Sequence, residues 1–408
     1  MLDKCRVLDL TDENGLLCGK ILADLGADVI KVERPGGDPA RRMDPFYGDE
    51  PDPEKSLQWF AYNSNKRGIT LDIEKDSGRR IFLDLVKTAD FMVESFRPGY
   101  MKSLKLGYED LCAVKPDIIM ASITPFGQDG QYSAYLSTDL VTMGMTGLLY
   151  QTGDKDTPPI HISMPQAFMH GGADAAVAMM IAYYHRETSG EGQYIDVSQQ
   201  QSVAWFLANA VPIYELTGII VERAGAYRWS LTSSQRQVWE CKDGYVFFNI
   251  IGGRGGAKTL RELVKWMDEY GMANDFLKSM DWENLDMFKA TQEEVDRISV
   301  PIDAFFKTRY KYEILESARA RSISICPLSS MGDLLADEQL AFRNFWTDLE
   351  HPELGATITY PREFAKSTEE SFATRFRAPL IGEHNREIYA ELGLTTDDLK
   401  NLSREGVI

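Results

Sequence analysis

The fold of this chain is decided by the stretch RVLDLTDENGLLCGKILADLGADVIKV, residues 6–32. It opens with a short apolar run that is typical of a buried strand, Arg6–Leu10. A polar turn then leads into a helical stretch that ends near Gly26, and a second strand pattern, DVIKV, follows at residues 28–32. A strand, a helix and a strand in this order predict a parallel βαβ unit.

The same alternation continues further along the chain. Residues 77–88 have a helical pattern, and strand patterns follow at Phe91–Glu94 and at residues 118–123. We therefore expect an α/β fold with a parallel sheet. A dinucleotide-binding turn would place GxGxxG after the first strand, but residues 11–15 read TDENG. This difference argues against a nucleotide-dependent dehydrogenase.

The length, net charge and cysteine pattern of the chain limit the kinds of protein that it can be. A chain of 408 residues is too long for one compact core, so we expect two domains. The formal charge of −18 argues against a nucleic-acid partner, because nucleic-acid binding needs a basic surface. The five cysteines are scattered without a CxxC pair, which indicates reduced thiols in a cytoplasmic protein and no zinc site. No secretory signal is recognised, and the longest apolar run, residues 175–184, is too short to span a membrane.

Two regions of the second half of the chain stand out. Residues 168–184 predict a helix that is apolar nearly all round, which we expect to be buried. Residues 260–270 and 277–297 have charged helical patterns that indicate a separate, smaller domain. Residues 318–327 return to the strand-and-helix pattern of the first half.

Six motifs spread along the chain carry a more specific signal. They read LADLGADVIKVERPGGDPAR (residues 22–41), YNSNKRGITLDI (62–73), VESFRPGYM (93–101), ITPFGQDGQY (123–132), HRETSGEGQYIDVS (185–198) and RAPLIGEHNREIYAELGL (377–394). Each motif alone is a weak signal. Together and in this order they make the chain similar to the class III CoA-transferases, the family of formyl-CoA and carnitine CoA-transferases.

The resemblance implies an architecture. It predicts a large α/β domain with a Rossmann-like parallel sheet, a smaller α+β domain, and an interlocked ring-type dimer. Residues 1–210 would form the N-terminal part of the large domain, and residues 211–315 the small domain with its linkers. Residues 316–408 would then complete the large domain.

The resemblance also implies a reaction and locates its nucleophile. In this family an aspartate carboxylate attacks an acyl-CoA thioester, so that covalent catalysis divides the exchange into easier steps. The position of that aspartate is ten residues after Pro158-Pro159 and four before Gly172, which is Phe168 in this chain. A phenylalanine cannot form an anhydride, so we expect no catalytic residue here. The racemases of the family need a histidine, which falls on Thr138, and the same aspartate, so racemase activity is set aside.

The positions that contact CoA in the family are altered as well. Arg34 and Phe96 match such positions, and Ser95 stands where the family has an asparagine; these three are the candidate CoA-binding residues. A family lysine corresponds to Glu74 and a family arginine to Ser103. Glutamate in place of lysine beside a phosphate exchanges attraction for repulsion. We therefore expect a vestigial CoA site, with the CoA thioester substrate bound by a partner chain and no tightly bound cofactor or metal.

The prediction from sequence is a non-catalytic subunit of a heteromeric CoA-transferase. Some family members, such as the benzylsuccinate CoA-transferases of aromatic degradation, pair two related chains, and the partner would carry the aspartate. Succinyl-CoA and an aromatic succinate such as benzylsuccinate are the candidate substrates, by analogy only. Two alternatives stay open: an active homodimeric transferase with a displaced nucleophile, and an acyl-CoA-binding or scaffold protein. No nucleic-acid or membrane partner is expected.

Overall fold

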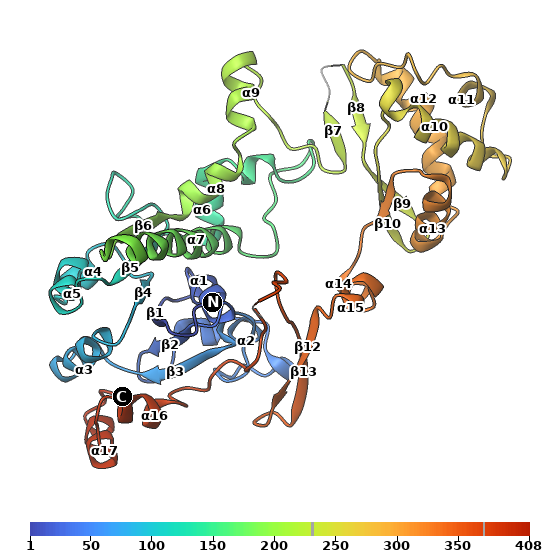
Figure 1. The fold of residues 1–408 in the computed structure, drawn as a ribbon. Coiled ribbons are helices and arrows are strands. Elements are labelled where there is room, and N and C mark those ends of the chain that lie inside the picture. Colours follow the sequence, from blue (N-terminus) through green and yellow to red (C-terminus); the bar gives the residue numbers. More distant parts are fainter. Residues whose placement is uncertain (230–231, 370–371) are drawn as a thin grey trace. The chain divides into compact units, whose positions relative to one another are not determined.

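The computed structural model describes residues 1–229, 232–369 and 372–408, which form two compact units (Figure 1). The first unit comprises Met1–Leu149, His161–Gly218 and Glu338–Ile408, and the second comprises Tyr150–Ile160 and Ile219–Asp337. The domain limits expected after residues 210 and 315 stay a prediction. Within the described ranges, no helix is long and apolar enough to cross a membrane.

The first unit is built on a six-stranded sheet whose strands are all parallel, as the α/β prediction required. The strand order is β3-β2-β1-β4-β5-β6, so β1 lies between β2 and β4. Leu8 of β1, for example, lies beside Ile30 and Met92 of these two neighbours. The strands are β1 Arg6–Leu10, β2 Asp28–Glu33, β3 Lys66–Thr70, β4 Phe91–Glu94, β5 Ile119–Thr124 and β6 Tyr194–Ser198.

Helices cover both faces of this sheet, which explains why its strands are apolar on both sides. Val7 and Val29 point to the face that packs on α1 (Leu16–Asp24) and α7 (Gln166–Ser189). Leu8 and Ile30 point to the opposite face, which α3 (Asp76–Val86), α5 (Tyr108–Val114) and α16 (Asn385–Glu391) cover. Each of the two faces therefore has its own apolar core.

The remaining elements of the first unit are short. They are the 3-10 turns Pro39–Arg42 and Tyr47–Asp49, the helices α2 Leu57–Asn63, α4 Tyr100–Ser103, α6 Asp139–Thr146, α8 Gln199–Phe206, α9 Ala210–Thr217, α15 Glu338–Phe342 and α17 Thr396–Arg404, and the hairpin of β12 Trp346–His351 and β13 Ala356–Pro361. The 3-10 turn Leu149–Gln151 begins at the last residue of one segment of this unit and continues into the second unit.

The second unit has an antiparallel sheet of order β11-β10-β9 packed on helices around a separate core. Its strands are β7 Tyr227–Trp229, β8 Ser234–Arg236, β9 Val238–Cys241, β10 Gly244–Phe248 and β11 Ile325–Pro327. Its helices are α10 Gly253–Asp268, α11 Asp275–Ser279, α12 Gln292–Phe306, α13 Lys311–Arg321 and α14 Met331–Leu335. Since β11 pairs with β10, residues beyond 315 still belong to this unit.

Two local predictions were wrong. The helix expected over residues 277–297 is interrupted, because α11 ends at Ser279 and α12 begins at Gln292 after the N-cap Thr291. The helix expected to be buried, α7, is buried on one side only within this chain. Val177, Ile181 and Tyr184 on its other side are exposed. The sequence pattern reports that a helix is apolar all round, but not which chain covers it.

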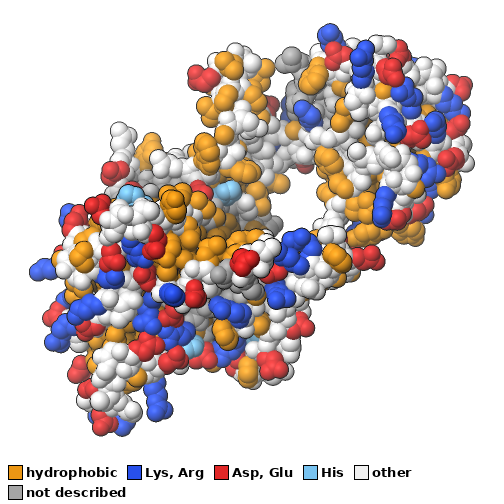
Figure 2. Space-filling view, viewed as in Figure 1, with side chains coloured by type: hydrophobic (Ala, Val, Ile, Leu, Met, Phe, Trp, Pro, Cys, Tyr) orange, Lys and Arg blue, Asp and Glu red, His pale blue; other side chains and the backbone are white. Residues whose placement is uncertain are grey.

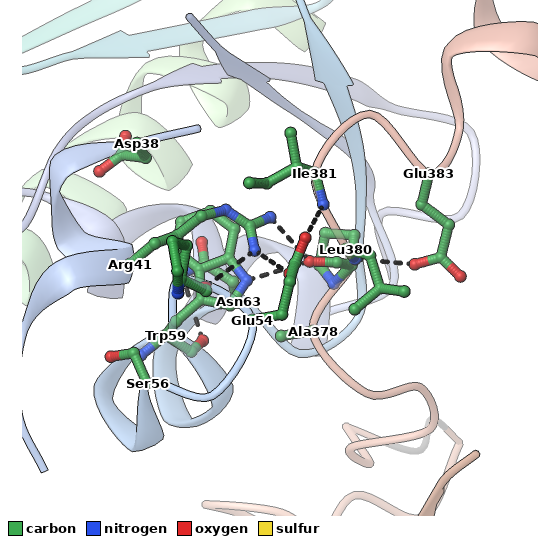
Figure 3. Close-up of polar contacts among 12 residues, drawn as sticks. Asp38, Arg41, Glu54, Ser56, Trp59, Asn63, Ala378, Leu380, Ile381 and Glu383 are labelled. Carbon is green, nitrogen blue, oxygen red and sulfur yellow. Dashed lines mark hydrogen bonds and ion pairs between the residues drawn. The ribbon is translucent and has the colours of Figure 1, made fainter. Parts of the chain in front are cut away.

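The first and last family motifs meet in a buried clamp (Figure 3). The guanidinium of Arg41 is fully buried, pairs with Glu33 and Glu54 at 2.6 Å each, and stacks 3.8 Å above the ring of Trp59. Arg41 and Trp59 both donate to the carbonyl of Pro379, at 2.8 and 3.0 Å. The clamp therefore ties the segment around Pro379 to the N-terminal residues Arg41 and Trp59.

Candidate functional site

The candidate site lies at the carboxyl ends of the central parallel strands. Strand order reverses between β1 and β4, and open α/β sheets bind their ligands in the crevice outside the strand ends at such a switch point. The loop after β1 begins at Thr11, and the chain after β4 begins at Ser95. Both therefore border this crevice.

A pair of hydrogen bonds links the two sides of the crevice. The Ser95 hydroxyl donates to the Asp12 carboxylate at 2.7 Å, and the Asp12 backbone N–H donates to the Ser95 hydroxyl at 2.8 Å. Both hydrogen-bonding roles of Ser95 are therefore already used within the chain. Binding of a ligand through this hydroxyl would have to displace a carboxylate.

A second carboxylate lies beside Phe96. The backbone N–H of Phe96 donates to Glu94 at 2.6 Å, and its ring lies 4.7 Å from the ring of Tyr100. Glu94 is almost completely buried, and burial raises the pKa of its carboxyl to about 7. The nearby charge of Asp12 acts on this pKa in the same direction as burial, whereas the hydrogen bond from Phe96 acts against it.

The third candidate, Arg34, follows β2 and faces an acidic residue too. Its guanidinium lies 3.9 Å from the carboxylate of Glu74, and both side chains are more than half exposed. The Tyr100 hydroxyl donates to the same carboxylate at 2.7 Å. Each of the three candidate CoA-binding residues thus has an acidic partner within the chain, which would repel the phosphates of CoA.

The loop after β1 adds further negative charge to this edge of the sheet. Glu13 is partly buried, and one of its carboxylate oxygens has no hydrogen-bond partner. Burial raises the pKa of Glu13, and the charge of Asp12 acts in the same direction. The sequence had indicated that this loop is acidic, but not that its Asp12 carboxylate bonds to the candidate residue Ser95.

Phe168 lies in the first turn of α7, at the position that the resemblance assigns to the nucleophile. Its side chain is half-buried and packs against an apolar cluster that includes Met143, Ala167 and Val203. Four residues later, a Cβ at Gly172 would lie only 3.0 Å from the Cβ of Leu17. Glycine therefore lets α7 approach α1 closely, and this contact fixes where the first turn of α7 lies.

Both carboxylate oxygens of Asp139, which bonds to the residue before Phe168, are occupied. One oxygen of Asp139 accepts from the backbone N–H of Ala167 at 2.7 Å, and the other lies 2.8 Å from Nε2 of His161. The ring of His170 lies 5.1 Å from the ring of Phe206. Asp174, two turns along α7, is exposed.

The residues that sequence reasoning missed are the acidic and phenolic partners Asp12, Glu94 and Tyr100. Asp12 and Glu94 could have been found, since each lies at or just beyond the carboxyl end of a predicted strand. The pairing of Tyr100 with Glu74 had no signal in the sequence, because the two residues are far apart along the chain. Among the residues that the structure describes, no cluster of three or more His, Cys, Asp or Glu side chains could hold a metal ion.

Comparison with known proteins decides the family. Residues 2–385 match CoA-transferase family III. The chain belongs to this family. It is 35% identical to the succinyl-CoA:(R)-benzylsuccinate CoA-transferase subunit BbsE of Thauera aromatica, over 99% of this chain and 97% of the relative.

Two further similarities agree with this assignment. The succinyl-CoA:mesaconate CoA-transferase of Haloarcula hispanica is 31% identical over 97% of each chain. The crystal structure of a CaiB/BaiF family protein from Brucella suis superposes with a TM-score of 0.80 at 28% identity, covering 96% of this chain and 99% of the other. The family III member described here therefore has the family's α/β fold, and its relatives are CoA-transferases.

Proposed function

We propose that this family III chain is the non-catalytic subunit of a heteromeric CoA-transferase. The observation that carries the proposal is Phe168, packed against Met143 and Val203 at the position of the family nucleophile. Loss of a covalent nucleophile costs roughly a millionfold in rate in a well-studied protease. The partner would be a homologous chain that carries the aspartate and forms the covalent intermediate.

The arrangement of the crevice supports the same conclusion. Arg34, Ser95 and Phe96 are the candidate contacts to CoA, but each already bonds to or faces an acidic side chain. A substrate with several phosphate charges would lose more by repulsion here than one arginine restores. In this proposal the partner chain binds the CoA thioester, and the crevice of this chain is vestigial.

The names of two relatives suggest which substrates the proposed assembly uses. Two relatives with different acceptor acids, (R)-benzylsuccinate and mesaconate, share succinyl-CoA as the donor. We propose succinyl-CoA as the donor for this assembly too. An aromatic succinate is proposed as the acceptor because the relative with 35% identity acts on benzylsuccinate and is itself a subunit.

The proposed assembly is an interlocked ring-type pair in the cytoplasm. Obligate interfaces exceed the ~1,600 Å² of a standard complex and are largely apolar. Expressed alone, the chain should therefore be poorly soluble or self-paired. Co-expressed with a homologous chain that has aspartate at the position of Phe168, it should form a stable heteromer whose mass is read by native mass spectrometry. Only homodimers of each chain would contradict the heteromer.

Activity of the isolated chain tests the catalytic half of the proposal. The chain is incubated with succinyl-CoA and candidate acids, and hydroxylamine or borohydride is then added to trap an acyl group on a carboxylate. We expect no adduct from this chain alone and an adduct on the partner in the heteromer. A trapped adduct on any carboxylate of this chain would make it an active homodimeric transferase. Absence of transfer with every partner would leave the acyl-CoA-binding or scaffold function.

The active-homodimer alternative has one observation in its favour. Asp139 is a carboxylate that contacts Ala167, the residue beside Phe168. Both of its oxygens are already bonded, one at the start of α7 and one to His161, and it is buried. Asp139 therefore holds the start of α7 in place, and neither of its oxygens is free to act as a nucleophile.

A further inference from the structure

An uncovered apolar groove runs between α1 and α7 of the first unit. It is lined by Leu17, Ile21, Val177, Met180, Ile181 and Tyr184 and encloses a volume of about 810 Å³. Val177, Ile181 and Tyr184 recur at the i, i+4, i+7 spacing of one helix face. Val177 is 60% exposed and Tyr184 76%. Figure 2 shows apolar side chains gathered around α7 on this face.

A second uncovered apolar element lies on the same unit. The helix α9 reads AVPIYELT, yet none of its eight residues is buried, and Leu216 is 86% exposed. Figure 1 draws α9 beyond the end of α8, away from the sheet. A helix shorter than ~12 residues is marginal in water by itself, so most of its stability must come from packing. The chain itself does not supply that packing for α9.

We propose that the α1/α7 groove receives the α9 helix of a second chain of the same fold. The proposal rests on the proposed function only in taking a family chain as the partner. An eight-residue helix is ~12 Å long and ~10 Å wide, which corresponds to roughly 900 Å³. The groove, at about 810 Å³, is therefore comparable in size to one such helix.

The chemistry of the groove favours a helix over a small ligand. Sites for small molecules combine apolar walls with a few free polar groups that fix orientation. The two charged residues at this groove, Lys20 and Asp24, pair with each other, and Lys20 also contacts Thr374. An apolar helix that lies in an apolar groove needs no further polar anchor.

The proposed contact between the groove and the helix can form in both directions between two chains. Each chain offers one groove and one helix, so two chains can exchange helices about a two-fold or pseudo-two-fold axis. In the isolated protein the second chain is another copy of this one, and in the heteromer it is the homologous partner. The same exchange would bury both uncovered elements of each chain at once.

Site-specific crosslinking tests the groove directly. The full chain is made with the photo-crosslinker p-benzoylphenylalanine at Ile181 and irradiated in intact expressing cells, so that poor solubility does not matter. We expect a dimer-sized adduct, and peptide mass spectrometry should map it to residues 205–221 of a second copy. A monomer without adduct, or an adduct to another region, to an unrelated protein or to a small apolar molecule, would overturn the proposal.

A matched pair of variants provides the control. Val177→Glu introduces a charge into the groove, whereas Val300→Glu makes the same change at a valine that is 67% exposed in the second unit. Val177→Glu should weaken self-association by at least about tenfold, since a charge buried in an apolar interface is costly, and Val300→Glu should leave it unchanged. Equal effects of the two variants would refute the groove. Assays of CoA transfer are independent: an active isolated chain that still crosslinks through α9 would refute the proposed function only.

Discussion

Reversal of the charge at Glu74 should restore CoA binding to this chain. Glu74 lies 3.9 Å from Arg34, the cation that the family resemblance assigns to the ligand. Two unit charges about 4 Å apart interact with about 1 kcal/mol in a water-like medium, which suits two side chains that are more than half exposed. Glu74→Lys replaces repulsion of one phosphate charge by attraction, a change of about 2 kcal/mol, or roughly 30-fold in Kd.

The assay is calorimetric titration of CoA into the folded chain at low salt. Glu74→Gln removes the charge without reversing it, so it should give about half of the free-energy change, or roughly fivefold. The gain should shrink as salt is added, because exposed charges are screened beyond ~10 Å at 0.1 M. Asp84→Lys is the matched control, since Asp84 is exposed to a similar degree and lies eight residues along α3, ~12 Å from its start.

Two results would refute this reasoning. A wild-type chain that already binds CoA with micromolar affinity would show that the acidic partners do not block the crevice. Equal gains from Glu74→Lys and Asp84→Lys would show that only the net charge of the protein matters. In either case the candidate contact at Arg34 would lose its support.

Three further predictions concern the nucleophile position, the clamp and a buried acid. Phe168→Asp alone should show no more CoA transfer in a coupled assay than Phe168→Asn, the control whose side chain has the shape of aspartate without its charge. The reason is that CoA binding and the nucleophile act as a unit, so restoring one of them recovers little activity. Turnover by the aspartate variant would mean that the CoA site is intact. Arg41→Ala should lower the free energy of unfolding by about 3–5 kcal/mol in urea titrations, since it leaves the buried carboxylate of Glu33 unpaired. The same change at the exposed neighbour, Arg42→Ala, should have little effect. A similar loss of stability in both variants would contradict the role of the clamp. Glu94 has a pKa raised from 4.5 to about 7 in the folded chain, so the folded state holds more protons than the unfolded state between these values. Its contribution to stability is therefore complete at pH below about 4.5 and is lost as pH rises to about 7. Glu94→Gln should remove about one proton from the pH dependence of unfolding over that range, and an unchanged pH profile would contradict the shift.

The sequence by itself determined the class of fold and the family. Apolar runs such as Arg6–Leu10 and Phe91–Glu94 alternate with helical patterns, and this local periodicity is enough to predict parallel βαβ units. The six motifs identified the family, whereas the assignment of Phe168 to the nucleophile position stays a prediction. The inferences of fold class and family succeed because each depends on residue types at short separations along the chain.

Only the tertiary structure decided what surrounds those residues. Ser95 and Asp12 are far apart in sequence, and their hydrogen bond exists because β1 and β4 are neighbours in the sheet. The exposure of Val177 likewise depends on which elements pack on α7, and an apolar pattern is the same whether the chain itself or a partner covers it. Hydrophobic periodicity records how polar a helix face is, whereas burial and pairing depend on the path of the whole chain.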